Sequence, residues 1–141
     1  MTDVRLYLHV GAPDPAWTDL LGSGERKRYE GMTHEAARGA FLAGRALARL
    51  GLSEAHPGTP PGGWRFQHGP HGKPYATPNR ADGPRFNIAH TTGLVTCVVS
   101  SGPMKIGVDV ERADRPVSHR RLAARYFDAR EVESLAGLAD G

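Results

Sequence analysis

The stretch RFNIAHTTGLVTCVVSSGPMKIGVDV, residues 85–110, decides the fold that we expect for this chain. Apolar side chains gather in three short runs at 85–89, 94–99 and 105–110, with the length and composition of β-strands. Residues 100–103 have the composition of a tight turn, which predicts a hairpin between the last two strands. The stretch therefore predicts the centre of a small, largely antiparallel sheet.

One more strand and a long helix complete the prediction. Alternating apolar and polar side chains over residues 4–10 predict a half-buried strand. A helix is expected from about His34 to Leu50, with Thr33 as its N-cap and Gly51 at its end. One face of this helix carries mainly small apolar residues that favour close packing on a sheet, namely Ala36, Gly39, Ala40, Leu42, Ala43, Ala46, Leu47 and Leu50. The predicted fold class is α+β, a small sheet with one long helix packed on it.

The remaining segments are expected to be less regular. Residues 17–29 predict a short, interrupted helical stretch, and residues 57–84 predict a long excursion rich in turns. Two further helices are expected, one over residues 118–126 and one that starts at a capping box formed by Asp128 and Glu131. Arg45 and Arg49, on another face of the long helix, are expected to be solvated.

The composition narrows the class of protein. The 141 residues suffice for one ordinary domain, and no apolar run approaches the roughly 20 residues that cross a membrane. The single cysteine, Cys97, lies in an apolar run and predicts a buried thiol, and with no signal pattern at the N-terminus we expect a cytoplasmic protein. The net charge is +3, but aromatic residues do not alternate with the basic ones, so a nucleic-acid-binding domain is the least favoured class.

Asp109 and Glu111 are the main chemical signal. In the predicted strand 105–110 and its continuation they share one face, where two like charges repel unless a cation lies between them. Mg²⁺ suits such a pair, because it commonly takes one or two carboxylates together with waters and phosphates. The alternative is a solvent-facing strand whose acids pair with Arg112 and Arg115, and periodicity alone does not decide between the two.

Four segments in chain order resemble the motifs of the Sfp-type 4′-phosphopantetheinyl transferases. They are Gly72-Lys73-Pro74, Phe86-Asn87-Ile88-Ala89-His90, Gly107-Val108-Asp109-Val110-Glu111, and Arg125-Tyr126-Phe127 with Glu131. The resemblance runs over about residues 25–138, and it implies one half of a pseudo-dimer of two α+β halves. It also implies a Mg²⁺-dependent transfer of the phosphopantetheine arm of coenzyme A to a serine of an acyl or peptidyl carrier protein. Such carriers serve fatty acid, polyketide or non-ribosomal peptide biosynthesis.

The resemblance also assigns roles to residues. Asp109 and Glu111 would hold Mg²⁺, and Glu111 and His90 would be the catalytic residues. The coenzyme A site would be lined by Arg38, Gly72, Lys73, Pro74, Asn87, Ile88, Ala89 and His90. Lys73 and His90 would contact phosphates, and Arg38, with Arg26 as a further candidate, would lie near the 3′-phosphate.

Three departures from the family pattern affect these expectations. Ala89 stands where the family usually has a serine, and His68 stands where an arginine is common. The later family motif, a tryptophan followed by Lys-Glu-Ala, is absent beyond Glu131. We therefore expect a first subdomain over residues 1–103 and an incomplete second one over 104–141, whose missing C-terminal half is a partner. The alternative is a non-catalytic module that binds coenzyme A or a carrier protein and self-associates.

Overall fold

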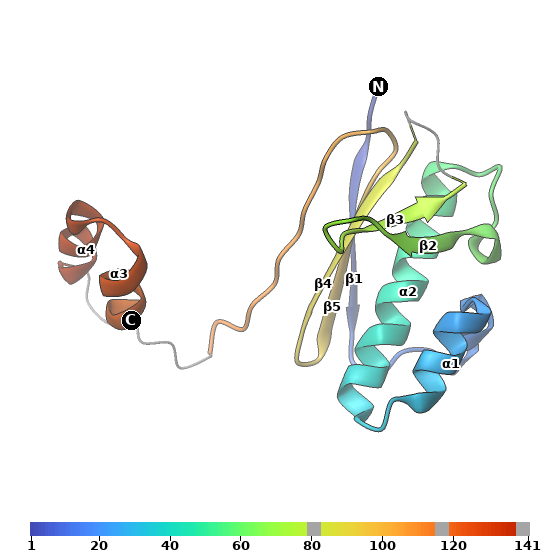
Figure 1. Ribbon diagram of the computed structural model, residues 1–141, viewed down its shortest axis with the longest axis horizontal. Coiled ribbons are helices and arrows are strands. Elements are labelled where there is room, and N and C mark those ends of the chain that lie inside the picture. The colour runs from blue at the N-terminus through green and yellow to red at the C-terminus, as the bar shows by residue number, and fades with distance from the viewer. Residues whose placement is uncertain (79–82, 115–118, 138–141) are drawn as a thin grey trace.

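The computed structural model describes residues 1–78, 83–114 and 119–137. Its centre is an antiparallel three-stranded sheet in the order β1-β5-β4, and a long helix covers one face of it (Figure 1). The elements are β1 (Val4–Val10), β4 (Arg85–Thr91), β5 (Leu94–Ser100) and the helix α2 (Glu35–Ala55). The α+β class and the strands predicted at 4–10, 85–89 and 94–99 are confirmed.

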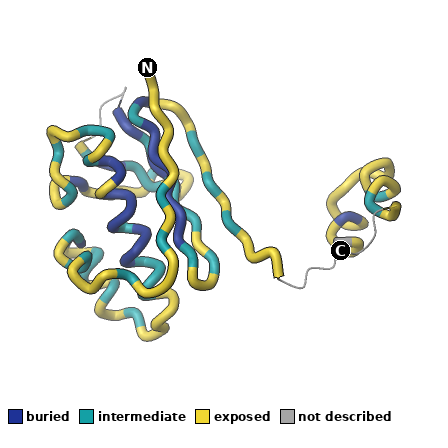
Figure 2. The backbone as a smooth tube through the Cα atoms, turned by 180° about the vertical axis from the view of Figure 1, so that it is seen from behind, coloured by how far each residue is buried: buried dark blue, intermediate teal, exposed yellow. Residues whose placement is uncertain are grey.

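The core lies between α2 and the inner face of the sheet. In the register, Tyr7 of β1 and Ile88 of β4 lie opposite Cys97 of β5, so all three point to the same face. Cys97 is fully buried there, as the sequence predicts, and burial raises the pKa of its thiol to about 12. The inner face is therefore apolar, and Figure 2 shows the buried positions concentrated in α2 and the central strand.

Glycines in α2 allow the helix to approach the sheet closely. A Cβ on Gly44 would lie 3.0 Å from Ile88 Cγ2, and one on Gly51 would lie 2.7 Å from Tyr7 Cε2. The prediction that Gly51 ends the helix is therefore wrong, because Gly51 is a buried packing position and α2 continues to Ala55. The N-cap is likewise not Thr33 but the next residue, His34, whose Nδ1 accepts from the Ala37 N–H at 3.4 Å.

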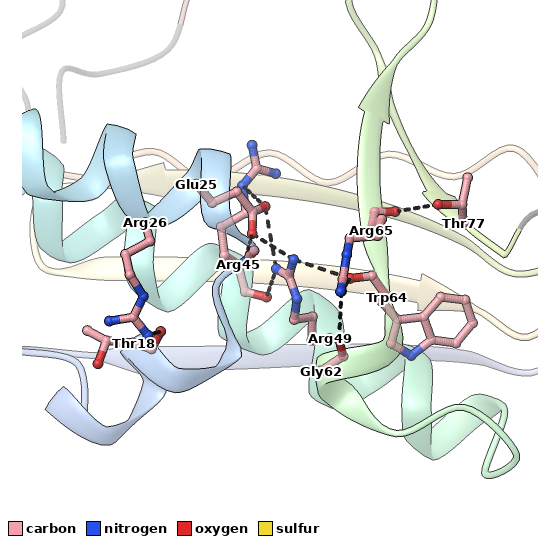
Figure 3. A network of polar contacts seen from close by, with 10 residues as sticks. Thr18, Glu25, Arg26, Arg45, Arg49, Gly62, Trp64, Arg65 and Thr77 are labelled. Atoms are coloured by element: carbon pink, nitrogen blue, oxygen red, sulfur yellow. Dashed lines mark hydrogen bonds and ion pairs between the residues drawn. The ribbon is translucent and has the colours of Figure 1, made fainter.

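The prediction that Arg45 and Arg49 form a solvated face is wrong. Arg49 has no exposed surface, and its Nη2 lies 2.6 Å from Glu25 Oε2, while Arg45 Nε lies 3.3 Å from Glu25 Oε1 (Figure 3). Glu25 belongs to α1 (Ser23–Gly31), which packs beside α2. Burial lowers the pKa of both arginines, and the Glu25 carboxylate opposes that shift. One carboxylate thus holds one buried and one half-buried guanidinium group between the helices.

Two short 3-10 helices and a hairpin complete the part of the fold around the sheet and α2. A 3-10 turn, η1 (Pro15–Leu20), precedes α1, and a second, η2 (Pro61–Gly63), precedes the hairpin of β2 (Arg65–His68) and β3 (Pro74–Thr77). The excursion predicted at 57–84 therefore contains regular elements, and Trp64, which precedes β2, is 2 % exposed and belongs to the core. The β2–β3 hairpin packs near β4, which brings Lys73 toward the sheet.

The predicted strand at 105–110 is absent. Neither sheet in the described part of the chain includes it, so the hairpin predicted at 100–103 is also wrong. We call residues 104–110 the strap; it runs on the side of the sheet away from α2 (Figure 1). Ile106, Val108 and Val110 are half-buried while Asp109 is exposed, so the strap keeps the alternation of a strand without joining a ladder.

Two helices lie near the C-terminus. α3 (His119–Tyr126) and α4 (Ala129–Ala136) pack on each other, and Asp128 caps α4 by accepting from the N–H groups of Arg130 and Glu131. The predicted capping box is confirmed. Ser118, the predicted start of the first of these helices, lies outside the described residues.

Candidate functional site

A large pocket lies at the end of the sheet where β4 turns into β5. Its volume is about 940 Å³, and it is bounded by the N-terminal half of α2, the turn between β4 and β5, and the loop after β1. Three of the predicted site residues line it, namely Arg38 from α2, His90 from β4 and Glu111, which directly follows the strap. The fold therefore brings together three residues that are far apart in the sequence.

A smaller pocket of about 280 Å³ lies next to the first. His90 lines both pockets, and the smaller one also includes the predicted residues Pro74, Asn87 and Ile88. Gly72 and Ala89, also predicted for the site, do not line either pocket. Gly72 has a φ of +74° in the tight turn of the β2–β3 hairpin, a conformation that favours glycine.

Arg38 stacks on an aromatic ring at the rim of the large pocket. Its guanidinium carbon lies 4.3 Å from the centroid of the Tyr29 ring, and its Nε is buried without a hydrogen-bond partner in the described structure. The stacked side chain is held in place by Tyr29. A partly buried cation with unused hydrogen-bonding capacity is suited to an anionic ligand.

Lys73 and Asn87 contact the strap. Lys73 Nζ donates to the Ile106 carbonyl oxygen at 3.0 Å, and the Val108 N–H donates to Asn87 Oδ1 at 2.9 Å. An ammonium has three N–H donors, so Lys73 keeps two of them for a ligand. The two contacts tie the strap to the β2–β3 hairpin and to β4.

Asp109 and Glu111 are exposed carboxylates two residues apart, separated by the half-buried Val110. In an extended backbone such residues point to the same side, at a spacing of about 7 Å between their Cα atoms. The Val110 N–H donates to Asp109 Oδ1 at 2.9 Å, which leaves the other carboxylate oxygen for a ligand. No group of three or more metal-ligating side chains occurs among the described residues. Two exposed carboxylates nevertheless fit Mg²⁺, because that ion typically completes its shell with waters and substrate phosphates.

Of the two arginines in the alternative pairing, Arg112 lies among the described residues. Arg112 pairs with Asp114, and this hydrogen bond holds the pKa of the Asp114 carboxyl below its usual value. Arg115, the other proposed partner, lies outside the described residues. Arg112 therefore has its partner in Asp114, an acid outside the predicted carboxylate pair.

Sequence reasoning missed Arg28 and Tyr29 of α1. Arg28 lines the smaller pocket, and Tyr29 lines the larger one beneath Arg38. Arg26, the further candidate for a phosphate, instead donates to the Thr18 carbonyl oxygen at 2.6 Å (Figure 3). The helical repeat of α1 is the signal that distinguishes Arg28 from Arg26, because residues two apart on a helix point in different directions.

Two known proteins are similar to this chain along most of its length. The chain is 35% identical over 144 residues to "4'-phosphopantetheinyl transferase HetI" of Nostoc sp., an alignment that covers 98% of this chain and 60% of that protein. It is 31% identical over 124 residues to "Putative 4'-phosphopantetheinyl transferase slr0495" of Synechocystis sp., covering 88% of this chain and 50% of the relative. The chain thus spans about half to three fifths of the length of these relatives. No model of a protein family matches it. No helix among the described residues could span a membrane.

Proposed function

Because the chain belongs to the 4′-phosphopantetheinyl transferase family along nearly its whole length, we propose that it supplies the coenzyme A-binding part of such an enzyme. The proposed reaction moves the phosphopantetheine arm of coenzyme A to a serine of an acyl or peptidyl carrier protein. The observation that carries the proposal is the convergence of Arg38, His90 and Glu111 on one pocket of about 940 Å³. Pockets of that size hold nucleotide-sized ligands.

The charges in and around the two pockets match the ligand. Coenzyme A carries a 3′-phosphate and a pyrophosphate, and Arg38, Arg28 and Lys73 are cations at or beside the two pockets. We assign Arg38 to the 3′-phosphate and Lys73 and His90 to the pyrophosphate. Phosphoryl transfer depends mainly on such positioning and charge stabilisation, and little on covalent chemistry supplied by the protein.

Asp109 and Glu111 are the residues that would hold Mg²⁺, which when bound offsets the charge of the pyrophosphate. In the transfer, the carrier serine oxygen forms a bond to the β-phosphorus, the bond from that phosphorus to the bridging oxygen breaks, and 3′,5′-ADP leaves. We assign the serine proton to the Glu111 carboxylate, since this residue is on the pocket wall. We expect the working enzyme to be cytoplasmic and to consist of two similar halves, of which residues 1–103 form the first.

A transfer assay tests the proposal. An apo carrier protein is incubated with the chain, coenzyme A and Mg²⁺, and its mass is measured, with His90→Ala as the matched variant. We expect a gain of one phosphopantetheine arm, either from the chain alone or after addition of the region that follows it in its relatives. No gain in either arrangement would contradict the proposal.

A second candidate is a non-catalytic module that binds coenzyme A or a carrier protein and self-associates. Four apolar residues of the edge strand β1 favour it, because Val4, Leu6, Leu8 and Val10 are 49%, 57%, 60% and 77% exposed. Coenzyme A binding without transfer in either arrangement, combined with a dimer in sedimentation equilibrium, would support this candidate over the first.

A further inference from the structure

Strand pairing does not fix the position of the strap, residues 104–110, in the described part of the chain. Among the described residues it pairs with no strand, yet it carries Asp109 and leads directly into Glu111. A backbone segment outside a sheet needs other partners for its N–H and C=O groups. Side chains from elsewhere in the fold must therefore decide where the strap lies.

Two side chains supply those partners. Asn87 Oδ1 accepts from the Val108 N–H at 2.9 Å, and Lys73 Nζ donates to the Ile106 carbonyl oxygen at 3.0 Å. Asn87 is half-buried on β4, which pairs with β5 over seven residues, so its position is well fixed. Lys73 is exposed in the turn of a hairpin, so its hold on the strap is weaker. Asn87 is thus the stronger of the two anchors.

Asn87 lies between the segment that carries the carboxylates and the pocket residue His90. Val108, which it holds, precedes Asp109 by one residue, and Asn87 precedes His90 by three residues on β4. Three residues of strand span about 10 Å and reverse the facing of the side chain. One strand therefore places Asn87 between the wall of the smaller pocket and the strap, and His90 on the wall of both pockets.

We propose that Asn87 is a positioning residue, which holds the strap through the Val108 N–H and thereby sets where Asp109 and Glu111 lie relative to His90. The proposal rests on the proposed function and differs from the expectation that Asn87 touches coenzyme A. A residue of this kind changes how the carboxylates engage a metal ion. It does not change the affinity for coenzyme A in the absence of the ion.

The test compares Asn87→Ala with Thr96→Val. Thr96 is 3% exposed on the neighbouring strand, and its hydroxyl donates to the Ala89 carbonyl oxygen at 3.1 Å, so both variants lose one side-chain hydrogen bond from the sheet. The first readout is hydrogen exchange of the Val108 amide by NMR, in the protein without ligands. We expect this amide to be protected in the unchanged chain and in Thr96→Val, and to exchange about threefold to tenfold faster in Asn87→Ala. Asn87→Asp keeps the acceptor oxygen and restores the protection.

The second readout is coenzyme A binding by titration calorimetry, in EDTA and over a series of Mg²⁺ concentrations. We expect Asn87→Ala to raise the Mg²⁺ concentration for half-maximal enhancement of binding on the order of tenfold, with affinity in EDTA unchanged. Thr96→Val leaves both values unchanged. An equal loss of affinity in EDTA and in Mg²⁺ would overturn the proposal in favour of a direct contact.

Other outcomes separate this proposal from the proposed function. If the unchanged chain binds coenzyme A with Mg²⁺ and Asn87→Ala shifts neither readout, only the positioning role fails. If the unchanged chain does not bind coenzyme A, with or without Mg²⁺, the proposed function fails and the positioning role fails with it. If Asn87→Ala does not fold, the unchanged chain still decides, because a Val108 amide that exchanges freely there overturns the proposal.

Discussion

Removing the charge of Glu25 should destabilise the protein more than any other single change to a charged residue. Glu25 Oε2 lies 2.6 Å from Arg49 Nη2, and its Oε1 lies 3.3 Å from Arg45 Nε. The Arg49 side chain is 1% exposed and that of Arg45 is 13% exposed, so neither can regain full hydration when the carboxylate is lost. Breaking a buried pair from one side costs about 3–5 kcal/mol, a large share of the roughly 5–15 kcal/mol that stabilises a typical domain.

Urea unfolding of Glu25→Gln measures this cost, and Glu30→Gln is the control. Glu30 lies on the same helix but is exposed, so its substitution should change the free energy of unfolding by less than about 0.5 kcal/mol. The double variant Glu25→Gln/Arg49→Met should be more stable than Glu25→Gln alone, because the uncompensated buried charge is removed as well. A loss below about 1 kcal/mol in Glu25→Gln would show that the carboxylate does not compensate a buried charge on Arg49.

Three further predictions follow from packing, ionisation and ligand charge. Gly51→Ala should lower the free energy of unfolding by about 1–2 kcal/mol in urea unfolding, because its Cβ would lie 2.7 Å from Tyr7. Gly24→Ala is the control and should raise that free energy slightly, because nothing lies within 4 Å of its Cβ. Cys97 should resist a thiol reagent at pH 8 until the chain is unfolded. Since its pKa is raised from 9.0 to about 12, the folded state keeps a proton that the unfolded state loses, so stability should fall as pH rises through that window, and Cys97→Ala should lessen the fall. Arg38→Met should weaken binding of coenzyme A by about tenfold to a hundredfold but leave binding of 3′-dephospho-coenzyme A nearly unchanged, as measured by calorimetry; an equal loss for both would remove Arg38 from the 3′-phosphate.

Much of the sheet and of the long helix could be predicted from local patterns. The alternation over residues 4–10 and the apolar runs at 85–89 and 94–99 match β1, β4 and β5, because each of these strands has one face on the core. The strand predicted at 105–110 has an equally good pattern. It lacks a partner, and whether a segment pairs is decided by the rest of the fold and cannot be read from its own residues.

The errors in the long helix have a similar cause. Glycine near the end of an apolar pattern commonly terminates a helix, but Gly51 is retained inside α2 since Tyr7 and Val99 leave no room for a side chain. An arginine is usually solvated, but Arg49 is buried since Glu25, 24 residues earlier, meets it across two helices. Both outcomes depend on contacts between distant residues.

Three residues that line the large pocket could be named from the sequence, but the geometry of the pocket could not be predicted. Arg38, His90 and Glu111 converge on the large pocket, while Arg28 and Tyr29 could be recognised only once α1 was placed beside α2. Asn87 and Lys73 were expected to touch coenzyme A, and their contacts with the strap required coordinates. Roles that act through a second segment of the chain leave no short-range signal.

The proposed coenzyme A site combines the pocket residues with the carboxylates of Asp109 and Glu111. Calorimetric titration of coenzyme A into the chain, with Mg²⁺ and with EDTA, tests it most directly, and Asp109→Ala is the matched variant. We expect tighter binding with Mg²⁺ than with EDTA, and loss of that difference in Asp109→Ala, whose exposed side chain should not affect folding. No binding by the unchanged chain, or the same Mg²⁺ enhancement in Asp109→Ala, would contradict it.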